Sequence, residues 1–337
     1  MTETNRSPQT DVVEEIAADI LRPTRTAGGW VSPRGINTDL VPWRLWEKSK
    51  KLFWDPAALD YSADREQWAA MPVEYQDAVI GVATGFMVGE ESVTLDILPL
   101  VMAMADEGRL EEVIFLTSFT LEEAKHVDFF RRWLTEVGAD IPGFNARQQA
   151  LAERMGLPFD LDRREGMWES ELPRVMRRLL VDRSARAVLD ASLTYNQFVE
   201  GCLAISGYGI WADLFAALNA LPAMQEGIRH VRVDESRHIT YGTYLCQRIL
   251  SANPDLIDFA RKRLVELRDF WFTVYPRVDD PENPIATENG RRFEALVFDQ
   301  VERRTAVMER AAQMSLADLL TTSAAEDAER DLLSVTG

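Results

Sequence analysis

Cysteine and histidine are both scarce in this chain of 337 residues. The two cysteines, Cys202 and Cys246, form no CxxC pair, which argues against a disulfide scaffold and against a sulfur-rich zinc or iron–sulfur site. Sparing use of cysteine fits a reducing compartment, so we expect a cytoplasmic protein. With only three histidines present, any histidine-containing site must be built from very few positions.

Positive charge is also in deficit. Lys plus Arg number 37 against 55 Asp plus Glu, which gives a formal net charge of −18. Nucleic-acid binders usually show a basic excess or patch, and an anionic membrane surface would repel this balance. We therefore expect no nucleic-acid partner. The acid excess is consistent with solvated helix faces or with oxygen ligands for metal ions.

Long uninterrupted hydrophobic runs are missing as well. The most apolar stretches are residues 79–105 and 204–224, and acidic residues break both. Neither offers the roughly 20 clean apolar residues of a transmembrane helix. The N-terminus shows no basic segment followed by an apolar run. We therefore predict no integral membrane segment and no signal peptide.

Apolar residues recur at three- and four-residue spacing, the pattern of amphipathic helices. The pattern predicts helices over 79–104, 110–137, 173–205, 223–250 and 291–314, a long connection over 138–172 with a short helix at 146–155, and a loop over 275–290. Alternating runs of Val, Ile and Thr are missing, so we expect an all-α fold. Residues 1–320 are predicted to form one domain with an N-terminal arm (1–50), and 321–337 a disordered acidic tail.

One internal repeat lies in the spacing of acids and histidines. Each half has a glutamate on one helix and a Glu-x-x-His motif on the next, 33 or 35 residues later. The members are Glu90, Glu123 and His126 in the first half, and Glu200, Glu235 and His238 in the second. Two of the three histidines of the chain belong to this repeat.

The spacing gives the repeat a chemical meaning. Residues i and i+3 of a helix share a face, so the Glu and His of each motif can converge on one ion. Their neighbours are apolar, and a carboxylate among apolar residues is unfavourable unless it is paired or binds metal. One Glu from each of two helices plus Glu-x-x-His from two others is the ligand set of di-iron and di-manganese bundles. The alternative is four surface glutamates in salt bridges and two core histidines.

Two nearby residues are open to more than one interpretation. His230 lies on a different face from Glu235, so we take it as structural or exposed. Asp234 directly precedes Glu235. It is either a hydrogen-bond partner for a ligating imidazole or an acid on the helix surface.

These residues resemble the ferritin-like superfamily, and within it the small subunit of class I ribonucleotide reductase, over about residues 72–250. Two further positions resemble the sister family of ligand-binding oxidases. That resemblance implies a ferritin-like bundle with manganese at Glu90, Glu123 and His126, and iron at the other three ligands. Glu123 and Glu235 would bridge the ions. It also implies a buried long-chain fatty acid and a homodimer; two iron ions are the alternative metal content.

The two further positions are a valine and a tyrosine that the oxidase family joins by an ether link in a two-electron oxidation. They are Val93, three residues after Glu90, and Tyr195, five residues before Glu200. The residues alone do not predict this link. In an ideal α-helix Tyr195 lies about 140° around the axis from Glu200, and a tyrosine there would be a core residue.

Three classes of function follow. The first is an oxygen-activating Mn/Fe oxidase whose natural substrate the sequence does not identify. The second is a radical-generating reductase subunit, in which Phe130 replaces the usual radical tyrosine; residues 324–337 contain no aromatic side chain for radical transfer. The third is iron storage or lipid carriage. The length of the chain argues against ferritin-type storage, whereas lipid carriage stays open.

Overall fold

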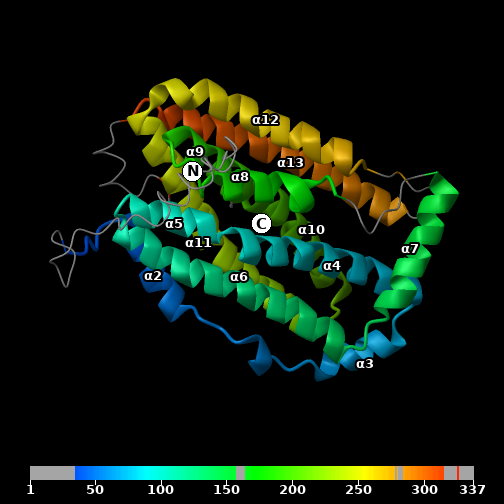
Figure 1. Ribbon diagram of the computed structural model, residues 1–337. Helices are drawn as coiled ribbons and strands as arrows, with labels where there is room; N and C mark the ends of the chain where they lie inside the picture. Colours follow the sequence, from blue (N-terminus) through cyan, green and yellow to red (C-terminus); the bar gives the residue numbers. More distant parts are fainter. Residues whose placement is uncertain (1–34, 157–163, 278, 280–283, 315–324, 326–337) are drawn as a thin grey trace, which may run out of the picture.

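The computed structural model describes residues 35–156, 164–277, 279, 284–314 and 325 (Figure 1). Within these residues all regular secondary structure is helical, which confirms the all-α prediction. Of the predicted N-terminal arm, residues 1–34 lie outside the described part. The predicted acidic tail, residues 321–337, also lies outside it apart from Ala325.

Four helical segments form the centre of the bundle. They are α4 (Val73–Asp96), α6 (Leu110–Glu136), the π-helical segment η3 (Leu193–Ala204) and α11 (Pro222–Ala252). α4 packs against α6, η3 packs against α11, and α6 contacts α11. The two halves of the sequence repeat are thereby brought face to face.

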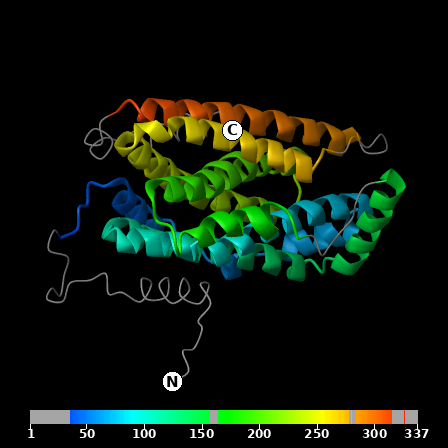
Figure 2. The same ribbon diagram turned by 45° about the horizontal axis from the view of Figure 1, so that its top comes forward.

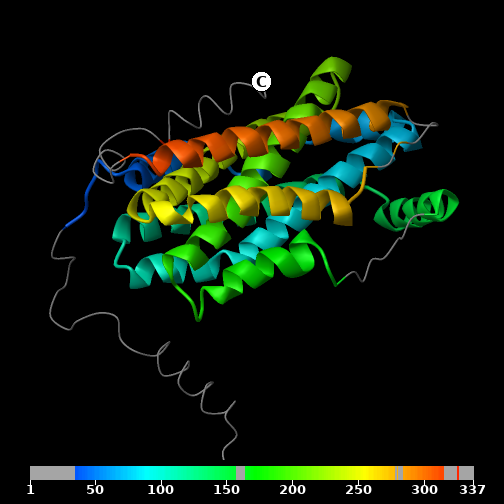
Figure 3. The ribbon, with the colours of Figure 1, turned by 90° about the horizontal axis from the view of Figure 1, so that it is seen from above.

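The remaining helices cover this centre. α12 (Ile257–Val274) and α13 (Pro284–Ala311) lie side by side over η3, as Figures 2 and 3 show. α2 (Val41–Lys51) packs on α6 and α11, and α7 (Ile141–Met155) stands at one end of the bundle. The other elements are η1 (Pro56–Ala58), α3 (Ser62–Ala70), α5 (Leu98–Asp106), η2 (Met167–Glu171), α8 (Leu172–Arg178), α9 (Ala185–Ser192), α10 (Ile205–Leu218) and η4 (Pro254–Leu256).

The prediction of one helix over residues 79–104 was wrong. The chain bends at Ile97, and α5 starts with Pro99 in its first turn. Proline has no backbone N–H, so Pro99 cannot donate the helical hydrogen bond to the Leu95 carbonyl, and α4 ends at Asp96. At the other end, α4 begins six residues earlier than predicted.

Other boundaries also differ from the prediction. The predicted helix 173–205 is α8, a turn over 179–184, α9 and η3, and the helical chain then continues through α10 to Leu218. α7 starts five residues earlier than predicted because the Asp140 side chain accepts a hydrogen bond from the Gly143 N–H at 3.0 Å, which caps it. α13 begins inside the predicted loop 275–290. The predictions for 110–137 and 223–250 are correct to within two residues.

One described stretch, Val73–Asp106, is long and apolar enough to cross a membrane by length and composition alone. It comprises α4 and α5, is bent at Ile97, and contains the buried acids Glu90 and Asp96. A single stretch of this kind is weak evidence for a membrane segment. Only 28% of its most apolar window is buried, so the stretch presents an apolar outer face.

Candidate metal centre

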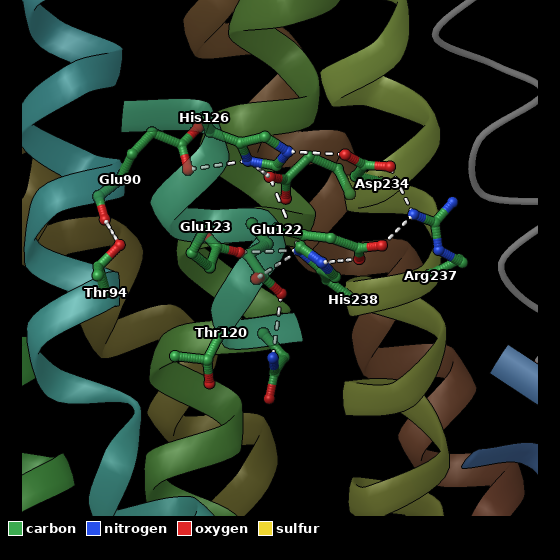
Figure 4. A network of polar contacts seen from close by, with 12 residues as sticks. Glu90, Thr94, Thr120, Glu122, Glu123, His126, Asp234, Arg237 and His238 are labelled. Atoms are coloured by element: carbon green, nitrogen blue, oxygen red, sulfur yellow. Dashed lines mark hydrogen bonds and ion pairs between the residues drawn. The ribbon is translucent and has the colours of Figure 1, made fainter. Parts of the chain in front are cut away.

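The six residues of the sequence repeat meet in the middle of the bundle, and all six are buried. Figure 4 labels Glu90, Glu123, His126 and His238 among them. They form two overlapping groups in which the candidate ligand atoms all lie within 4.8 Å of one another. Both groups share Glu123 and Glu235. The first group adds Glu90 and His126, and the second adds Glu200 and His238. Two shared carboxylates between two sites are the arrangement expected for bridging ligands.

Both imidazoles turn Nδ1 toward this cluster. Nδ1 of His126 lies 3.2 Å from Glu90 Oε2 and 3.4 Å from Glu235 Oε1. Nδ1 of His238 lies 2.8 Å from Glu123 Oε1 and 3.7 Å from Glu200 Oε1. Each histidine therefore presents one ring nitrogen to the carboxylates of its own group.

Within the described residues, three buried ligand atoms have no partner that meets hydrogen-bond geometry. They are Glu200 Oε1, Glu235 Oε2 and His238 Nδ1. Buried polar atoms in native proteins are almost always satisfied, so a cluster of such atoms needs an explanation. Oxygen and imidazole donors converging within a few ångströms fit divalent first-row metal ions, which would satisfy all three atoms at once.

The charge state of the cluster points the same way. Burial and the neighbouring carboxylates Glu90 and Glu235 raise the pKa of Glu123 well above its ordinary value. Burial and Glu235 do the same to the pKa of Glu200. Burial alone would lower the pKa of His126, but the charge of Glu90 and further hydrogen bonds raise it well above 6.5. The site thus attracts positive charge, which two dications would supply.

Asp234 is a partner of a candidate ligand rather than a surface acid. It is fully buried, and its Oδ2 lies 3.1 Å from Nε2 of His126 and accepts the Trp54 Nε1–H at 2.8 Å. The surface interpretation was therefore wrong. His230 lies outside both groups, where its ring stacks on Trp54 at 4.9 Å.

The equivalent partner of His238 is Glu122, which was not predicted. Glu122 Oε2 lies 2.9 Å from Nε2 of His238, and Glu122 is buried. The signal that could have found it is a repeat longer than Glu-x-x-His. Residues 122–126 and 234–238 both have the pattern acid–Glu–x–cation–His. The cations are Lys125 and Arg237, and both are buried.

The π-helical geometry of η3 corrects the expected position of Tyr195. In a π-helix the hydrogen bonds run from i to i+5, so residues five apart lie one turn apart on the same face. Tyr195 and Glu200 are five apart within η3, and the 140° separation predicted for an α-helix does not apply. The Tyr195 hydroxyl donates a hydrogen bond to Glu123 Oε1 at 3.2 Å. Val93 is buried on α4 in the same apolar cluster as Tyr195.

A cavity of about 520 Å³ opens onto the carboxylates. Glu90, Glu123, Glu200 and Glu235 line it, and Val93 lies among its apolar walls. The other apolar lining residues come from α4, η2, η3, α10, α12 and α13 and include Phe86, Trp168, Leu203, Trp211, Trp271 and Phe293. The volume falls within the range of small-molecule sites, and a mostly apolar wall with a few convergent polar groups is their usual composition.

Comparisons with known proteins agree with this geometry. The family described as ribonucleotide reductase, small chain, matches residues 39–267. The R2-like ligand-binding oxidase from Sulfolobus acidocaldarius is 32% identical, with a TM-score of 0.70; the match covers 87% of this chain and 98% of that chain. An R2-like ligand-binding oxidase with aerobically reconstituted Mn/Fe cofactor is 31% identical, with a TM-score of 0.70. The match covers 84% of this chain and 98% of that chain. A variant of an R2-like ligand-binding oxidase with aerobically reconstituted Fe/Fe cofactor is 31% identical, with a TM-score of 0.70. The match covers 84% of this chain and 99% of that chain.

Proposed function

Because the chain belongs to the ribonucleotide reductase small-chain family and, within it, to the R2-like ligand-binding oxidases, we propose that it is an oxygen-dependent oxidase with a dinuclear metal centre. The observation that carries the proposal is the pair of buried ligand groups that share two glutamates. Glu90, Glu123 and His126 hold manganese, and the second group holds iron. When bound, the ions supply the activation of O₂.

The ligand set is the part of the proposal that metal analysis tests. Anaerobic loading with Mn(II) and Fe(II) should give two ions per chain in the wild type. Glu235→Ala removes a shared carboxylate and should lose at least one ion. Glu226→Ala, an exposed glutamate on the same helix, is the matched control and should retain both. A wild-type chain that retains no transition metal after loading contradicts the proposal.

The second part is an ether link between Val93 and Tyr195. The Cβ–H bond of Val93 and the phenolic O–H bond of Tyr195 break, a Cβ–O bond forms, and two electrons and two protons pass to O₂. Two observations support it: the Tyr195 hydroxyl already faces the carboxylate cluster through Glu123, and Val93 lines the cavity above the same cluster. Both side chains are buried.

The third part is a long-chain fatty acid in the cavity. Its carboxylate would bind the ions, since oxygen donors suit both metals. Its tail would lie among the apolar walls, where burial gains about 0.8 kcal/mol per methylene. Organic extraction of purified protein followed by mass spectrometry tests this. Repeated preparations without a co-purifying fatty acid would count against it.

The fourth part is a homodimer. Val88 and Leu95 on α4 and Leu98 and Met102 on α5 are exposed apolar residues, with Leu95 74% exposed; we refer to these four as the apolar stripe. A contiguous exposed apolar patch marks an interaction surface, and a second copy of this chain is the occupant we propose.

The cytoplasm is the location that we propose for the protein, because its two buried cysteine thiols suit a reducing compartment.

The reductase-subunit alternative has less support. The position four residues after His126 is Phe130, whose buried ring has no hydroxyl group to oxidise. The oxidase is therefore the function that we propose.

A further inference from the structure

The two histidine motifs exchange their outer carboxylates. Asp234 belongs to the second motif but contacts Nε2 of His126, whereas Glu122 belongs to the first motif but contacts Nε2 of His238. Figure 4 shows both contacts. Nδ1 of each ring is turned to the ligand cluster, so a metal ion bound there would leave Nε2 to carry the hydrogen and donate it to the carboxylate. Each candidate site is thereby supported by the acid of the opposite motif.

The two outer carboxylates differ in how much positive charge faces them. Asp234 has Nζ of Lys125 at 2.7 Å from Oδ2, and Nη2 of Arg237 on Oδ1. Trp54 donates a further hydrogen bond to it. Among the described residues, the only cation in ion-pair contact with Glu122 is Arg237, at 2.6 Å, which it shares with Asp234. Lys125 is thus the positive charge that Asp234 has beside it and Glu122 lacks.

This difference in charge changes how strongly Nδ1 of each imidazole can bind a metal ion. An outer carboxylate that accepts the imidazole N–H makes the ring a stronger ligand. A cation beside that carboxylate draws its charge away and weakens the effect. His126, supported by the compensated Asp234, is therefore the weaker nitrogen donor, and His238, supported by Glu122, is the stronger one. Iron(II) gains more from a strong nitrogen donor than manganese(II) does, as their order of affinities indicates.

We propose that Lys125 is a positioning residue for metal choice: through Asp234 it weakens His126 as a ligand, so that manganese occupies the Glu90–Glu123–His126 site and iron the Glu200–Glu235–His238 site. The inference rests on the proposed Mn/Fe centre and adds the residues that decide which ion takes which position. It concerns side chains that belong to neither ligand group and do not line the cavity.

The test is site-resolved metal occupancy after anaerobic loading with equal amounts of Mn(II) and Fe(II). Anomalous diffraction at the two absorption edges reads each site separately, and elemental analysis gives the total. Lys125→Gln should raise the Fe:Mn ratio at the His126 site by about tenfold, the lower end of the effect of outer partners on metal affinity. Lys125→Arg keeps the charge and should retain the wild-type distribution.

Two further variants sharpen the result. Glu122→Gln weakens the support of His238 and should lower the Fe:Mn ratio at the second site, in the opposite sense to Lys125→Gln. Arg248→Gln is the matched control, because Arg248 is also a buried cation but pairs with Glu107 and Glu112 instead of the outer carboxylates. It should leave the distribution unchanged.

Three outcomes would overturn the inference. The first is an unchanged distribution in both Lys125→Gln and Glu122→Gln. The second is loss of metal without exchange between metals, which would mean that the outer carboxylates only hold the rings in place. The third is identical behaviour of Lys125→Gln and Lys125→Arg. A wild-type chain that binds no metal overturns the proposed function as well, so the two failures are distinguishable.

Discussion

Buried charge is the dominant feature at the scale of single residues. Glu123 and Glu200 are buried beside other carboxylates, and burial together with this repulsion raises the pKa of each well above 4.5. The pKa of His126 is raised as well, chiefly by the charge of Glu90 against the effect of burial. Without metal, the folded chain therefore holds protons at these positions that the unfolded chain releases at lower pH.

A dependence of stability on pH follows. Groups whose pKa rises on folding contribute stability that is present at low pH and lost as the pH rises. The Tm of the metal-free protein should therefore fall as the pH rises above 4.5, the ordinary pKa of these glutamates. Ions at 1,000 times their Kd would add about 4 kcal/mol, because they bind only the folded chain. Calorimetry of both forms should show the gap in Tm widening with pH; parallel curves would contradict the ligand assignment.

At this scale the sequence was informative about the candidate metal ligands, because only a few residue types can bind such ions. The spacing of Glu123 and His126 predicted a shared face, and the structure brings them together with the other four residues of the repeat. Glu122 was not predicted because the repeat was defined by Glu-x-x-His alone, without the acid that precedes each motif. The repeat does not say which imidazole Glu122 contacts; the packed helices place it beside Nε2 of His238.

At the scale of elements, the close approach of η3 and α11 sets the second half of the site. Gly242 on α11 faces Asn196 on η3, and a Cβ built at Gly242 would lie 2.0 Å from Asn196 Cβ. That atom is fixed to the backbone and cannot move aside. Asn196 in turn donates a hydrogen bond to Glu200 at 3.0 Å. Glycine at this position lets the two helices place Glu200 near Glu235 and His238.

Gly242→Ala should therefore push the two helices apart. We expect a loss of stability of about 1–3 kcal/mol from overpacking, together with lower metal occupancy at the second site. Gly85→Ala is the matched control, because a Cβ at Gly85 meets nothing within 4 Å. Replacing that helical glycine should leave stability equal or raise it by up to about 1 kcal/mol. Chemical unfolding measures both, and equal stability of the two variants would contradict this account of the contact.

Helix boundaries show where prediction from the pattern fails. Periodicity identified the central helices, yet it missed the bend before Pro99, although the proline itself is a local signal. The π-helical segment had no signal in the apolar spacing. It depends on packing against α11, α12 and α13, so the shared face of Tyr195 and Glu200 could not be derived from an ideal helix.

At the scale of the whole molecule, the apolar stripe on α4 and α5 is the proposed dimer interface. Leu95→Glu places a charge in its centre and should convert the proposed dimer to a monomer. Phe298→Glu on α13 is the matched control, since Phe298 is also an exposed apolar residue but lies on another helix. Light scattering gives the mass of each form. A monomeric wild type, or a dimer that persists in Leu95→Glu, would contradict the proposed interface. The single-domain assignment of residues 1–320 stays a prediction.

The central claim is that this bundle uses O₂ to oxidise its own Val93 and Tyr195 at a dinuclear centre. Peptide mapping of metal-loaded protein before and after exposure to oxygen tests it most directly. We predict separate peptides before oxygen and, afterwards, one joined species lighter by two hydrogen atoms than the sum of the two. Tyr195→Phe should bind metals and never form the joined species, because the phenolic oxygen is absent. Full recovery of separate, unmodified Val93 and Tyr195 peptides after oxygen would contradict the claim.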